Sequence, residues 1–125
     1  LDQIWPDDMD FKNAYFWGPL GIDYEFGVLE NQTRNAIQMV HRIGALVVTV
    51  AIIALTFSFK NYTILKNNLF LMLILLAAQV ALGIINVVMS LPMFAAVMHN
   101  AVALGLLLSL TSLAHKVFNN PMTAQ

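Results

Sequence analysis

Two histidines are the residues of this chain with the clearest capacity for chemistry. His41 lies just before an apolar run that has no charged residue from Ile43 to Phe59, and His99 lies in the last apolar segment. An imidazole in apolar sequence is costly unless its nitrogens have partners, so such residues are functional candidates by default. Imidazole nitrogens bind metals, form hydrogen bonds and transfer protons. Which of these roles applies depends on the elements that position the two rings.

The composition is that of a membrane protein. Of the 125 residues, 59% are hydrophobic and 10% are charged, whereas a soluble domain is about a quarter charged. The net charge of −1 hides a segregation, because all seven acidic residues lie within the first thirty positions. The chain offers no basic surface of the kind that nucleic acid requires. We therefore expect membrane lipid, and no nucleic acid, among its partners.

Several kinds of chemistry are excluded by the residue types. A pair of carboxylates for acid–base catalysis could come only from the N-terminal segment, where all the acidic residues lie. The chain has no cysteine, which excludes disulfides, zinc thiolate sites, iron–sulfur clusters and covalent heme attachment within it. It begins at Leu1 without a signal peptide, so we expect it to be part of something longer.

Three apolar segments are long enough to cross a bilayer. Each exceeds the roughly 20 residues that span a hydrocarbon core of about 30 Å. We therefore predict an all-α integral membrane fold, with a transmembrane helical bundle over residues 35–118 and a tail over residues 119–125. The predicted spans of that bundle are residues 35–59, 69–91 and 93–117.

Residues 1–34 are predicted to form an outer loop segment. Proline and glycine interrupt it, and its tryptophans and tyrosines favour the membrane interface. A short helical turn is expected around Asp10 to Ala14. Outside this segment, Lys60, Lys66 and Lys116 fall on one side of a three-span topology. By the positive-inside rule that side is cytoplasmic, so the N-terminal loop lies outside and the C-terminus lies in the cytoplasm.

With this topology the two histidines lie at equal depth. His41 is six residues after Asn35, and His99 is six residues after Met93. At about 1.5 Å per residue, both rings lie roughly 9 Å below the outer ends of their helices. Two imidazoles at one depth can supply both axial ligands of a heme iron in the core of a helix bundle. The alternative is that both rings only make interhelical hydrogen bonds, and the residues leave both interpretations open.

Small, polar and basic residues near the histidines are further site candidates. Gln79, Gly83 and Asn86 recur at positions i, i+4 and i+7 of the second span, a stripe expected to frame a heme or donate hydrogen bonds. Arg42 and Arg34 lie on the outer side of the first span, where arginine forks can bind heme propionates. The alternative for the stripe is ordinary helix packing. The alternatives for the arginines are contact with lipid headgroups and ion pairs with Glu30 and Asp23.

Several stretches of the chain resemble the second half of heme A synthases. They are residues 30–34 (ENQTR), 38–46 (QMVHRIGAL), 79–87 (QVALGIINV), 91–92 (LP) and 96–100 (AVMHN). Residues 5–11 and 23–27 are similar to the outer loop of proteobacterial members of that family. The match keeps order and spacing over nearly the whole chain.

The resemblance implies an eight-helix membrane protein made of two similar four-helix bundles, which converts heme O to heme A by oxidising a ring methyl group to a formyl group. It implies that this chain is the C-terminal part, in which His41 and His99 ligate heme b. The implied location is the bacterial inner membrane. The implied partners are heme O and heme A through the N-terminal half, heme O synthase, and cytochrome oxidase assembly proteins.

The chain departs from the family pattern in two respects. A family half has four helices, whereas we predict three, so the first helix of this half is expected before Leu1. Many members also carry loop cysteines, which this chain lacks. By itself the chain is expected to be inactive and prone to form homo-oligomers through its polar stripe. A non-catalytic b-type cytochrome module for electron transfer and a plain membrane scaffold are the alternative functions, and Glu30 has no assigned role.

Overall fold

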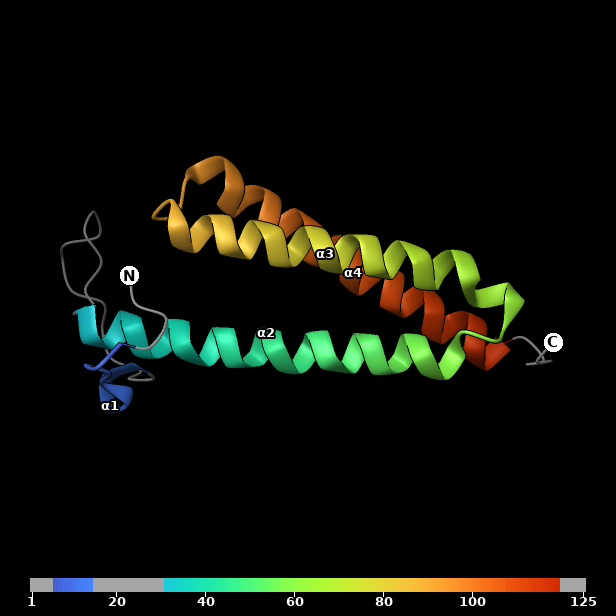
Figure 1. Cartoon of the computed structure of the whole chain (residues 1–125), viewed down its shortest axis with the longest axis horizontal. Coiled ribbons are helices and arrows are strands. Elements are labelled where there is room, and N and C mark those ends of the chain that lie inside the picture. Colours follow the sequence, from blue (N-terminus) through green and yellow to red (C-terminus); the bar gives the residue numbers. More distant parts are fainter. Residues whose placement is uncertain (1–5, 15–30, 120–125) are drawn as a thin grey trace. The chain divides into compact units, whose positions relative to one another are not determined.

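The described part of the chain is helical. The computed structural model describes residues 6–14 and 31–119, and none of these residues lies in a β-strand. Glu30 and most of the predicted outer loop lie outside the described residues, as do residues 120–125 of the predicted tail. The elements, shown in Figure 1, are α1 (Phe11–Ala14), α2 (Asn31–Phe59), the 3₁₀ turn η1 (Thr63–Leu65), α3 (Lys66–Val88) and α4 (Met93–Asn119).

Helices α2, α3 and α4 are long and apolar enough to cross a membrane. They contain 29, 23 and 27 residues, against the roughly 20 that a bilayer core requires. The prediction of an all-α membrane fold is therefore confirmed. The helices extend beyond the apolar runs at several ends: α2 begins at Asn31 rather than near Asn35, and α3 begins at Lys66 rather than Leu69.

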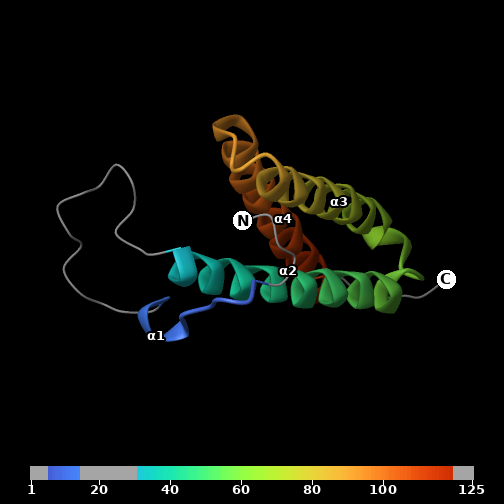
Figure 2. The same ribbon diagram turned by 60° about the vertical axis from the view of Figure 1, so that its left-hand side comes forward.

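The chain divides into two compact units, residues 1–47 and residues 48–125. In the first unit, Asp10 caps α1 by accepting a hydrogen bond at Oδ1 from the backbone N–H of Lys12, at 2.9 Å. The backbone N–H of Asp10 donates to the carbonyl oxygen of Gln32 at 3.2 Å, which ties α1 to the first turns of α2 (Figure 2). The short helix expected around Asp10 to Ala14 is thus confirmed.

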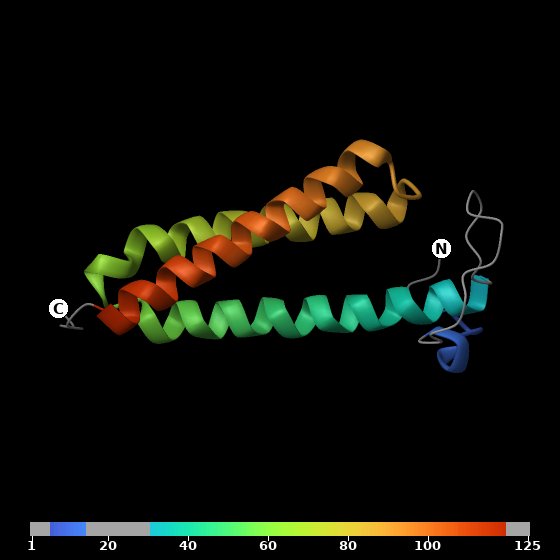
Figure 3. The same ribbon diagram turned by 180° about the vertical axis from the view of Figure 1, so that it is seen from behind.

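The second unit is built around the antiparallel pair α3 and α4, which lie side by side in Figure 3. Leu65 and Met72 are fully buried, because apolar side chains from the end of α2, from η1 and from both helices of the pair close over them. The core cluster consists of Ile52, Leu65, Leu69, Met72, Leu76, Leu106 and Leu113. This cluster fixes the register of the pair, and with it the neighbours of every polar residue between α3 and α4.

A tight turn joins α3 to α4. The N–H of Met89 donates to the carbonyl oxygen of Ile85, and the N–H of Leu91 donates to that of Asn86 at 2.8 Å, which satisfies two orphan carbonyls of the helix end. Ser90 and Leu91 adopt left-handed φ angles of 53° and 61°. Because the chain reverses within these residues, α3 ends at Val88 and the start of α4 lies against the end of α3.

Candidate functional site

His99 is held by a side chain of the neighbouring helix. Its ring is half-buried, and its Nε2 atom lies 3.1 Å from Nε2 of Gln79 on α3. The nitrogen of a glutamine amide donates, whereas the role of each imidazole nitrogen depends on the tautomer of the ring.

The imidazole of His99 packs closely against α3 at Gly83. A Cβ atom at position 83 would lie 3.4 Å from Cε1 of His99 and 3.9 Å from Nδ1. The ring edge thus approaches the α3 backbone closely, and a branched side chain at this position would displace it. The contact requires a small residue at position 83. Gly83 is the small member of the predicted stripe, which also contains Gln79 and Asn86.

Two buried oxygens of the same stripe have no hydrogen-bond partner among the described residues. They are Oε1 of Gln79 and Oδ1 of Asn86, whose residue is 9% exposed. A buried acceptor without a donor costs about 1 to 3 kcal/mol. The stripe therefore leaves acceptor capacity that a polar ligand group or a water molecule can use.

The predicted site residues of α2 belong to the first compact unit. His41 and Arg34 are exposed and Arg42 is half-buried, all on one continuous helix. A Cβ atom at Gly44, one turn after His41, would meet no atom within 4 Å. The structure thus brings Gln79 and Gly83 together with His99.

The donor set around His99 fits a heme iron. In the described part of the chain, no group of three or more histidine, cysteine, aspartate or glutamate side chains could hold a metal ion. A heme iron needs at most two protein ligands, because its porphyrin supplies the others. The imidazole of His99, which is held beside Gln79 and Gly83 between two apolar helices, is a nitrogen donor of the kind that a heme iron takes.

A second polar cluster was not predicted from the sequence. At the far end of the helix pair, Nδ2 of Asn68 donates to Oγ of Ser112 at 3.0 Å, and Nζ of Lys116 donates to Oδ1 of Asn68 at 2.5 Å. The sequence separation from the turn could have revealed this cluster. Asn68 lies 22 residues before Ser90, and Ser112 lies 22 residues after it. Residues at equal distances from a tight turn lie opposite each other in an antiparallel pair.

The three long apolar helices indicate a multi-pass membrane protein whose described residues are helical or in turns. A family model described as "Cytochrome oxidase assembly protein" (COX15-CtaA) matches residues 9–111, most of the chain. The chain belongs to this family, which confirms the resemblance read from its sequence motifs.

Two curated relatives are heme A synthases. The protein of Shewanella oneidensis is 40% identical over 111 residues, which cover 87% of this chain and 33% of the relative. The protein of Flavobacterium psychrophilum is 35% identical over 86 residues, which cover 66% of this chain and 25% of the relative. The chain thus spans a third or less of the length of these relatives. No solved structure matches it.

Proposed function

We propose that this chain is the heme b-binding C-terminal part of a heme A synthase, with His41 and His99 as the two axial ligands. The observation that carries the proposal is the imidazole of His99, whose Nε2 atom lies 3.1 Å from the side-chain amide nitrogen of Gln79 between two apolar helices. The place of each histidine within a long apolar helix and the names of the relatives support it.

In the whole protein the proposed reaction oxidises a methyl group of heme O to the formyl group of heme A. Residues 31–125 contain no aspartate or glutamate, so this part is suited to hold a heme rather than to supply carboxylates for acid–base steps. Heme b here would stabilise the bundle or relay electrons. Arg42 and Arg34 are proposed to bind its propionates, and Gln79, Gly83 and Asn86 to frame its ligand.

A reduced-minus-oxidised absorption spectrum of the protein at its natural full length tests the ligand assignment. We expect a low-spin b-type heme that is lost or becomes high-spin in His41→Ala and in His99→Ala. The matched control is His115→Ala, because His115 is exposed and bonds only to Asn119 among the hydrogen bonds described for its side chain. An unchanged low-spin spectrum in either ligand variant would refute the assignment.

Turnover of heme O by the same preparation separates the two functional classes. Formation of heme A that depends on both histidines supports the synthase. A low-spin b-type heme without any conversion of heme O favours the rival function, a b-type electron-transfer module. The proposed partners in the membrane are heme O synthase, cytochrome oxidase assembly proteins and further copies of the protein, and the proposed membrane is the bacterial inner membrane.

A further inference from the structure

We propose that Gln79 and the heme iron compete for the same atom, Nε2 of His99, so that Gln79 keeps the ligand ready in the heme-free protein and must release it when heme binds. The inference rests on the proposed function, since it takes His99 as an iron ligand. It assigns Gln79 as a positioning residue whose loss strengthens heme binding, whereas loss of a residue that supports the bound state would weaken it.

The competition follows from the number of lone pairs. A neutral imidazole has one in-plane lone pair. Nε2 of Gln79 lies 3.1 Å from Nε2 of His99, and in the proposed arrangement the amide nitrogen donates to that lone pair. The same lone pair must form the bond to iron. In the proposed arrangement this hydrogen bond breaks when Nε2 binds the iron.

The surroundings of Gln79 indicate a side chain that can be displaced. Its Oε1 atom is buried without a hydrogen-bond partner among the described residues, so the amide is only half satisfied in this arrangement. Gly83 presents no side chain to the ring, so the Cε1 edge of the imidazole lies beside bare backbone. The hydrogen bond to Gln79 thus holds the ring in one orientation. Because this bond is weak, a stronger partner of Nε2 can replace Gln79.

The hydrogen bond can be tested before any heme is added. In heme-free protein of natural full length, ¹⁵N nuclear magnetic resonance of the imidazoles should show His99 unprotonated at Nε2 and protonated at Nδ1. The resonance is identified by its absence in His99→Gln. In Gln79→Met, which keeps length and volume but cannot donate, the preference for this tautomer should fall. A wild-type His99 protonated at Nε2 would overturn the proposal.

Titration with hemin then measures the competition. Because a net hydrogen bond in a protein is modest, Gln79→Met should bind hemin about twofold to tenfold more tightly than the wild type. Asn68→Leu is the matched control, since it removes two side-chain bonds between α3 and α4 at the far end of the pair and should leave the affinity unchanged. Unchanged or weaker binding in Gln79→Met would overturn the proposal.

The two variants distinguish a failure of the proposed function from a failure of the competition between Gln79 and iron. If His99→Gln binds hemin as the wild type does, His99 is not a ligand and the proposed function fails together with the competition. If His99→Gln loses the heme but Gln79→Met gains no affinity, the ligand assignment stands and only the competition fails. The tautomer measurement needs no heme, so it reports on the Gln79–His99 bond in either case.

Discussion

At the scale of single residues, the site depends on one glycine whose missing side chain makes room for a ring. A Cβ atom at Gly83 would already lie 3.4 Å from Cε1 of His99, so the branches of a valine would overlap the imidazole. We expect Gly83→Val to lower the free energy of unfolding by about 1 to 3 kcal/mol, as overpacking does elsewhere. Thermal unfolding of the heme-free protein in detergent measures it.

The matched control for this substitution is Gly44→Val on α2. A Cβ atom at Gly44 meets nothing within 4 Å, so no side chain has to move. The free energy of unfolding should stay within about 0.5 kcal/mol of the wild type, as is usual where nothing is overpacked. Equal losses at positions 44 and 83 would show that the close contact with His99 carries no energy.

A second prediction at this scale concerns the buried oxygen of Asn86. Its Oδ1 atom has no hydrogen-bond partner among the described residues, and the residue is 9% exposed. Replacing it in Asn86→Leu removes an unsatisfied acceptor, which should raise the free energy of unfolding of the heme-free protein by about 1 kcal/mol. Asn67→Leu, at an exposed position of the same helix, is the control and should change little. A loss of stability in Asn86→Leu would mean that the oxygen already has a donor.

At the scale of elements, the α3–α4 pair is held at one end by a polar cluster. Asn68 bonds to both Ser112 and Lys116, so Asn68→Leu breaks two contacts between the helices. We expect the free energy of unfolding to fall by about 1 kcal/mol, given the modest average strength of such bonds in membrane proteins. Unfolding in detergent measures this, with Ser112→Ala, which breaks only one of the contacts, as the intermediate case. Identical losses in the two variants would show that the Lys116 contact adds nothing.

The existence of the three long helices could be predicted from their apolar runs, but several of their ends could not. Hydropathy locates the part of a helix that lies in hydrocarbon, whereas backbone hydrogen bonding continues into polar sequence. Helix α3 therefore begins at Lys66, directly after a turn anchored by the fully buried Leu65, and not at Leu69. It ends at Val88 because Ser90 and Leu91 adopt left-handed backbone angles.

The helix face that forms the site could be predicted from the sequence, but the contacts within the site could not. The spacing of Gln79, Gly83 and Asn86 placed them on one face of a helix, and the structure directs Gln79 and Gly83 at His99. The partner atom was not predictable, because it depends on the register of α3 against α4. That register is set by the tight turn and by the core around Met72, neither of which the stripe itself encodes.

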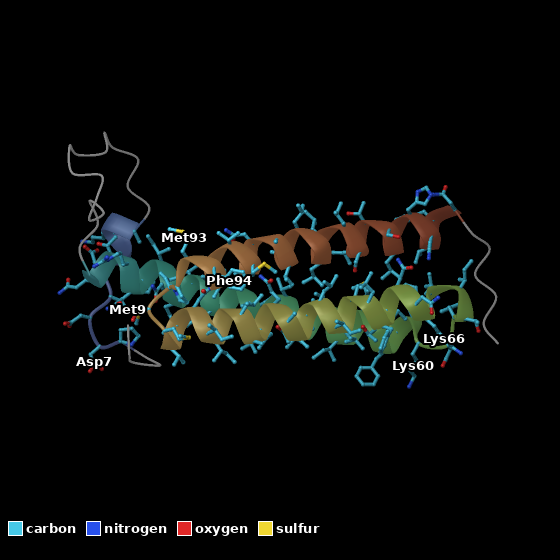
Figure 4. All side chains as sticks on the ribbon, turned by 90° about the horizontal axis from the view of Figure 1, so that it is seen from above. Asp7, Met9, Lys60, Lys66, Met93 and Phe94 are labelled. Carbon is cyan, nitrogen blue, oxygen red and sulfur yellow. The ribbon has the colours of Figure 1, made fainter. Side chains whose placement is uncertain are left out.

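At the scale of the molecule, the second compact unit has a basic end and an apolar end. Lys60 and Lys66 lie at the connection that precedes α3, while Met93 and Phe94 lie at the start of α4, toward the opposite end of the helix pair (Figure 4). Lys116 lies at the lysine end, since it bonds to Asn68. Between the ends, large side chains such as Phe70 and Leu108 are more than half exposed, which suits hydrocarbon and not water.

This polarity predicts the orientation, because lysines are retained on the cytoplasmic side. The chain has no cysteine of its own, so single cysteines can report on each end of α3 and α4. In the full-length protein, with any cysteine outside this chain replaced, Met93→Cys should react with a membrane-impermeant maleimide in intact cells. Asn61→Cys should react only in inverted vesicles. Both positions are exposed, so access depends on the side of the membrane and not on burial. The reverse pattern would place the lysines and the C-terminus outside, and His99 would then lie near the cytoplasmic face.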